Sequence, residues 1–60
     1  MTRKHYIMVA KAISNQYSHP NATNEVRAAL IAVVKSMSES FAYFNANFDR
    51  EKFENLCFNN

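Results

Sequence analysis

The chain has 60 residues and a formal net charge of +2, and it contains one cysteine, one proline and no glycine. A single cysteine excludes an intramolecular disulfide, and so short a chain has room for only one thin core. We therefore expect one helical domain over 1–60 that gains stability by self-association. The lone cysteine, the absence of a leader pattern and the lack of an apolar run of about 18 residues favour a cytoplasmic protein without a membrane partner.

The first predicted helix covers 3–18 and has a basic beginning. Arg3, Lys4 and Lys11 are the only charged residues before Glu25. Together with His5 they could contact phosphates or an acidic partner, and the alternative is a solvated face that keeps the protein soluble. The apolar residues recur at helical spacing and should face the core: Tyr6, Val9, Ala10, Ile13 and Tyr17.

The second predicted helix, over 23–45, is the longest. Pro20 ends the first helix, and the segment 21–24 supplies capping side chains, with Thr23 at the helix start. Apolar residues three and four apart form a continuous stripe: Val26, Leu30, Val33, Met37, Phe41 and Phe44. A second strip exceeds what one short helix can cover, and we expect it to be a dimer seam: Ile31, Val34 and Ala42.

The polar side of this second helix carries alternating serines. Ser36, Ser38 and Ser40 should point mainly toward water with their charged neighbours. Tyr43 lies near this side and is a candidate exposed anchor of the kind found at interfaces, with packing in the core as the alternative.

A break at Asn45-Ala46-Asn47 precedes a third predicted helix over 49–58. We expect asparagine to take the left-handed conformation that often ends helices. Asp49 should cap the third helix, with Phe48 and Phe53 placed as a hydrophobic staple. Phe53, Leu56 and Cys57 should then face inward, so structural roles are predicted for four residues: Phe48, Asp49, Phe53 and Cys57.

The run Phe48-Asp49-Arg50-Glu51-Lys52-Phe53, followed by Cys57, resembles the closing motif of a family of small phage and prophage proteins. The family pattern is Asn-Pro-x-Phe-Asp-x-x-Arg-Phe with a later cysteine, and Lys4-His5-Tyr6 resembles its opening segment. This chain departs from the pattern at Ala46, Lys52 and Phe58. The resemblance implies a phage or mobile-element origin but carries no known activity or site residues.

Catalysis and metal binding have little support in the residues. His5, His19 and Cys57 are the only soft metal ligands and lie in separate segments, so we expect no metal and no cofactor. A reactive role for Cys57 is the minor alternative, because its sequence neighbours provide no activating base. A short chain without glycine loops has little room for a catalytic pocket, and we expect no enzyme.

The leading functional hypothesis is a phage accessory protein that binds a host protein or complex in the host cytoplasm and inhibits a defence or regulatory system. The expected contact residues are Arg3, Lys4, His5, Lys11, Tyr43 and Phe58. One alternative is a small DNA-binding regulator that uses the corner before the third helix, although the acidic residues there disfavour it. Another is an oligomer that captures a small anionic ligand, such as a signalling nucleotide.

Overall fold

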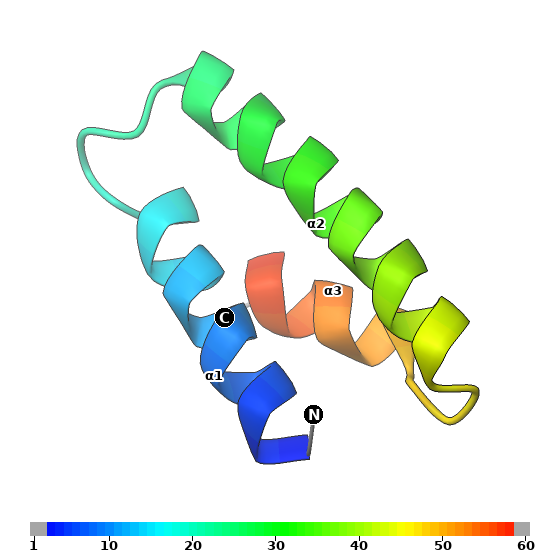
Figure 1. Cartoon of the computed structure of the whole chain (residues 1–60). Coiled ribbons are helices and arrows are strands. Elements are labelled where there is room, and N and C mark those ends of the chain that lie inside the picture. The colour runs from blue at the N-terminus through cyan, green and yellow to red at the C-terminus, as the bar shows by residue number, and fades with distance from the viewer. Residues whose placement is uncertain (1–2, 59–60) are drawn as a thin grey trace.

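The computed structural model describes residues 3–58, which form three helices joined by two short turns. The helices are α1 (Arg3–Tyr17), α2 (Asn24–Phe44) and α3 (Arg50–Phe58). In Figure 1, α1 and α2 diverge from their connecting turn, and α3 lies between them. The all-α prediction with a long central helix is confirmed, with each helix end within one residue of its expected position. The domain predicted over 1–60 includes residues 1–2 and 59–60, which lie outside the described part.

Two side-chain caps set the starts of α2 and α3. Thr23 has extended backbone geometry, and its hydroxyl accepts a hydrogen bond of 3.1 Å from the Val26 amide. The Asp49 carboxylate accepts one of 3.0 Å from the Lys52 amide. Each bond satisfies a backbone donor that a helix start leaves without a helical partner. Both predicted caps are confirmed, and both arise from local sequence.

The turn that ends α2 differs from the expected left-handed cap. Asn45 has φ −142° and ψ 103°, and no residue in 3–58 has a positive φ. The Asn45 side-chain oxygen instead accepts a hydrogen bond of 3.1 Å from the Asn47 amide. The Asn45 amide donates to the Phe41 carbonyl at 2.9 Å. The prediction of a left-handed asparagine was wrong because an asparagine side chain can build the turn with extended backbone.

The core lies where α3 meets the other two helices. Its most buried apolar residues are Ala10, Val34, Phe53 and Cys57. Phe53 also belongs to an aromatic cluster, which we define as Tyr6, Phe41, Phe48 and Phe53. The inward positions predicted for Phe53 and Cys57 are confirmed. Leu56 was expected to face inward as well, but it is 40% exposed.

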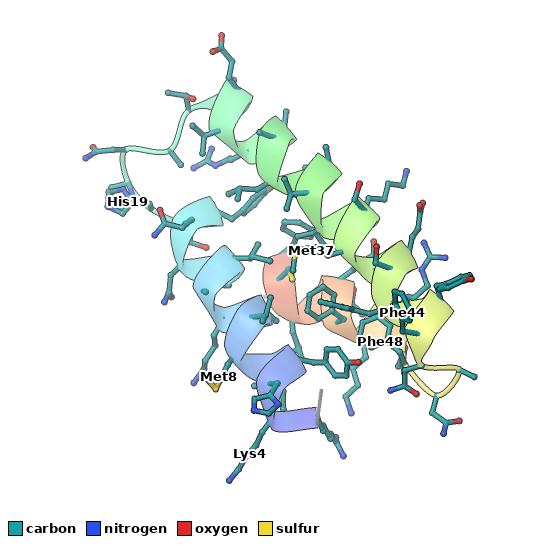
Figure 2. All side chains as sticks on the ribbon, viewed as in Figure 1. Lys4, Met8, His19, Met37, Phe44 and Phe48 are labelled. Atoms are coloured by element: carbon teal, nitrogen blue, oxygen red, sulfur yellow. The ribbon has the colours of Figure 1, made fainter. Side chains whose placement is uncertain are left out.

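The buried face of α2 is rotated from the predicted stripe. Val34, assigned to a dimer seam, is a core residue, and Ser38, expected to point toward water, is fully buried. Val33 is instead half exposed. Two neighbouring faces of α2 have residues at helical spacing. One is the predicted apolar stripe, and the other is the buried face, which contains Val34 and the polar residue Ser38. The spacing of apolar residues alone therefore predicted the wrong buried face, because it left Ser38 out. Met37 of the predicted stripe is half buried, and Figure 2 shows it between the helices.

Candidate functional site

A pocket of about 340 Å³ lies between the beginning of α1, the α2–α3 turn and α3, and we call it the corner pocket. Its volume falls in the range of small-molecule sites, about 300–1,000 Å³. Its walls combine aromatic, aliphatic and polar side chains. The aromatic residues are Tyr6, Phe48 and Phe53, and the aliphatic ones are Ile7 and Leu56. The polar and charged residues are Arg3, Asn45, Asn47, Asp49 and Lys52.

The aromatic wall of the corner pocket is held in place by packing. The Phe48 ring lies 4.6 Å from Tyr6 and 5.5 Å from Phe53, measured between ring centroids. The second contact is the predicted hydrophobic staple, because Phe48 precedes the Asp49 cap and Phe53 lies at the fourth position of α3. The staple therefore both fixes the entry of α3 and forms part of the pocket wall.

The corner pocket has two cations and one carboxylate at its rim. The Asp49 carboxylate accepts the Lys52 amide hydrogen bond, so part of its charge is directed at the start of α3. Within residues 3–58, the side chains of Arg3 and Lys52 form no ion pair. Both are exposed and can turn toward an anion in the pocket. The arrangement suits a ligand or side chain that joins an apolar part to a negative charge.

The outer side of α1 forms a second surface, which we call the basic face and define as Lys4, Ile7, Met8 and Lys11. All four residues are exposed, with Ile7 at 39% and Met8 at 66%. Lys4 and Lys11 are seven residues apart, close to two helical turns, so they lie on one side of the helix. In Figure 2, Lys4 and Met8 project away from α2 and α3. Ile7 also lines the corner pocket, which makes the two surfaces continuous.

The predicted contact residues do not form one site. Arg3 borders the corner pocket, whereas Lys4 and Lys11 lie on the basic face, and His5 is exposed on the same helix. Tyr43 is 84% exposed at the end of α2 and does not line the corner pocket.

Phe58 is half buried and packs edge-on against Tyr17, with 4.9 Å between ring centroids. Tyr17 is the last residue of α1, about 20 Å along the helix from Arg3. Phe58 therefore contributes to the core and lies far from the basic residues at the beginning of α1.

The positions of several residues at the surface and between the helices were not predicted from the sequence. Ile7 and Met8 fall outside the predicted core face of the first helix, and that position was a usable signal. Phe44 was assigned to the core stripe but is 84% exposed. Arg27 is half buried: its Nε donates to the Tyr17 carbonyl at 3.1 Å, and its guanidinium carbon lies 5.8 Å from the Tyr17 ring centre. No sequence pattern pointed to this contact between α1 and α2.

Cys57 has the properties of a structural core residue and not those of a reactive thiol. It is fully buried, and burial, with a smaller contribution from the Glu54 carboxylate, raises the pKa of its thiol from 9.0 to about 11. A raised pKa keeps the thiol protonated and therefore poorly nucleophilic near neutral pH. This supports the predicted structural role over the reactive alternative.

The described residues were also compared with the requirements of a metal site and of a membrane-spanning helix. Within 3–58, no three His, Cys, Asp or Glu side chains gather in a way that could hold a metal ion. None of the three helices there has the length and apolar character needed to cross a membrane.

Comparison of the chain with protein-family models, with curated proteins and with solved structures found no match. The likeness of the Phe48–Cys57 run to small phage proteins therefore stays a prediction from the sequence.

Proposed function

We propose that this protein is a non-enzymatic phage or prophage accessory protein whose basic face docks on an acidic surface of a host protein, inhibiting a defence or regulatory system. The observation that carries the proposal is the exposed pair Ile7 and Met8 between Lys4 and Lys11. The phage origin depends on the sequence resemblance, and the docking depends on this surface.

The chemistry of the basic face favours a protein partner with negative charge. The segment 1–24 contains no Asp or Glu, so nothing on α1 offsets its lysines. Lysines at the rim of an interface speed association with an acidic surface, and exposed methionine adapts to varied apolar partners. The neighbouring corner pocket can receive an anchoring side chain, which is where interfaces concentrate binding energy.

A DNA-binding role through α3 is less well supported. α3 packs against both other helices and lies between them, so it does not project as a recognition helix does (Figure 1). Its exposed residues include Glu51 as well as Arg50 and Lys52. The acidic side chain would repel phosphates and offset the attraction of the cations.

The docking proposal is tested by pull-down from host lysate with three baits. Wild type and a Lys35→Glu control, altered at an exposed position of α2, should recover the same stoichiometric partner. The double variant Lys4→Glu with Lys11→Glu should lose it, because it reverses the charge of the basic face. Circular dichroism confirms that all three are folded. Failure to recover a stoichiometric partner with wild type, or equal recovery by all baits, would contradict the proposal.

A second candidate function is capture of a small anionic ligand, and the corner pocket supports it. An aromatic or nucleobase-like group would stack in the wall formed by Tyr6 and Phe48, and its phosphate or carboxylate would meet Arg3 and Lys52.

The test of ligand capture is a thermal-shift and calorimetry screen of nucleotides and aromatic carboxylates. Binding should be abolished in Lys52→Glu and kept in Lys35→Glu, because Lys52 borders the pocket and Lys35 does not. The absence of any heat or stabilisation at millimolar ligand would rule this candidate out.

A further inference from the structure

A stripe of five apolar residues and one serine on α2 lies beside the core and is open to solvent for much of its length. We call it the heptad stripe. Its positions alternate in steps of four and three residues, the spacing of a coiled-coil seam: Val26, Leu30, Val33, Met37, Ser40 and Phe44. Val26 is 44%, Val33 50% and Phe44 84% exposed. Leu30 and Met37 are half buried, so they mark the border between the stripe and the core.

The heptad stripe carries no charge along its whole length. Lys35 follows Val33 by two residues and Glu39 follows Met37 by two, which places both about 200° around the helix from the stripe. The Arg27 side chain is turned toward Tyr17. The six positions of the stripe therefore offer a charged partner no side chain to pair with. The stripe suits another uncharged seam with the same spacing.

We infer that the heptad stripe is the interface of an antiparallel homodimer in which two copies of α2 pack along each other. The stripe is symmetric about residue 35, so a two-fold axis there pairs each position with another position of the stripe. Val26 then lies opposite Phe44 of the second copy, and Val33 lies opposite Met37.

Size and charge both favour the antiparallel direction. A parallel pair would place the two Phe44 rings against each other and the two Ser40 side chains against each other. The antiparallel pair matches the large Phe44 with the smaller Val26, and Ser40 with Leu30. Antiparallel neighbours also bring opposite ends of the helix dipoles together.

The area available is of the order that a stable dimer needs. Tyr43 packs on Phe44 with 5.0 Å between ring centroids, and each of the two is 84% exposed. Since a buried aromatic side chain covers about 150–250 Å², this pair would contribute roughly 250–400 Å² per copy. A standard interface buries about 800 Å² per partner. The valines and the exposed residues Ala29 and Ser36 beside them extend the contact.

This interface uses none of the residues that define the basic face or line the corner pocket. A dimer would therefore present two copies of each, and the inference stands or fails independently of the proposed function.

Light scattering and sedimentation equilibrium over a concentration series test the dimer. Wild type should approach twice the 6.9 kDa chain mass. Val33→Glu and Phe44→Glu should each give the single-chain mass while keeping their helical content, because both positions are solvent-exposed within one copy. Ile31→Glu is the matched control: Ile31 is 46% exposed on the same helix but lies about 200° from Val33. It should keep the dimer mass.

Cysteine cross-linking tests the direction of the pair. In a Cys57→Ala background, a mixture of Val26→Cys and Phe44→Cys chains should form the mixed disulfide, and neither chain alone should pair with itself. A self-disulfide of Phe44→Cys would show parallel pairing and overturn the antiparallel model. A wild type of single-chain mass at millimolar concentration, or equal disruption by Ile31→Glu and Val33→Glu, would overturn the interface.

Discussion

The Ser38 hydroxyl is buried, and its oxygen has no hydrogen-bond partner among residues 3–58. An unpaired buried hydroxyl costs free energy because water no longer solvates it. We expect Ser38→Ala to raise the free energy of unfolding by about 1 kcal/mol. Urea denaturation measures the change.

The control for this prediction is Ser36→Ala, at an exposed position of the same helix. It changes helix propensity by a few tenths of a kcal/mol and removes no buried polar group. Equal stabilisation by the two variants would mean that propensity, and not the unpaired hydroxyl, accounts for the effect.

The Cys57 thiol should make stability sensitive to alkaline pH. Burial raises its pKa from 9.0 to about 11 in the folded protein, whereas the unfolded chain keeps the ordinary value. The thiol is largely neutral in both states below about pH 8. As pH rises further, the unfolded thiol ionises first, so the free energy of unfolding should fall by about 2 kcal/mol between pH 9 and 11.

Cys57→Ala isolates this contribution, because both proteins share all other titrating groups. Urea unfolding at pH 8 and pH 11 should show the stability advantage of wild type shrinking by about that amount. Parallel pH profiles for the two proteins would contradict the assignment to Cys57.

At the scale of one element, the cap of α3 can be tested apart from its charge. Asp49→Ala removes the acceptor for the Lys52 amide and should cost about 1 kcal/mol, or a fall in Tm of roughly 4–8 °C for a domain of this size. Asp49→Asn should keep most of the stability, because asparagine caps helices as well as aspartate does. Thermal unfolding followed by circular dichroism measures both. An equal loss in the two variants would mean that charge, and not capping, is what matters.

The ends of the elements could be predicted from the sequence because local chemistry sets them. Thr23 and Asp49 cap the amides three residues ahead, so the information lies within a few positions. The orientation of α2 could not be predicted, because it depends on which of two overlapping faces meets the other helices. Val33 and Val34 are chemically identical, and only packing makes one exposed and the other buried.

The basic face could be predicted in part, since Lys4 and Lys11 lie on one side of any helix over this segment. The corner pocket could not. Its walls come from residues as distant as Arg3 and Leu56, and only the tertiary fold brings them together.

At the scale of the molecule, α3 contacts both other helices and holds the fold together. Phe53 is its central residue, 2% exposed and 5.6 Å from the Phe41 ring. Phe53→Ala should cost about 3–5 kcal/mol, a large part of the stability expected for a small domain. We expect α1 and α2 to lose their helical signal together with α3, as measured by circular dichroism.

Phe44→Ala makes the same chemical change at a side chain that is 84% exposed. Measured at a concentration where the variants are monomeric, it should alter stability by less than about 0.5 kcal/mol. Retention of native helicity by Phe53→Ala would show that α1 and α2 do not depend on α3.

The negative φ angles throughout residues 3–58 have a consequence for the unfolded chain. No described position requires glycine, and the chain contains none, whereas an average sequence of this length has about four. Each glycine avoided narrows the unfolded ensemble and reduces the entropy lost on folding, by roughly 0.4–1 kcal/mol where the native backbone permits the replacement. The glycine-free turns thus supply a thin-cored protein with stability that no contact in the folded structure reveals.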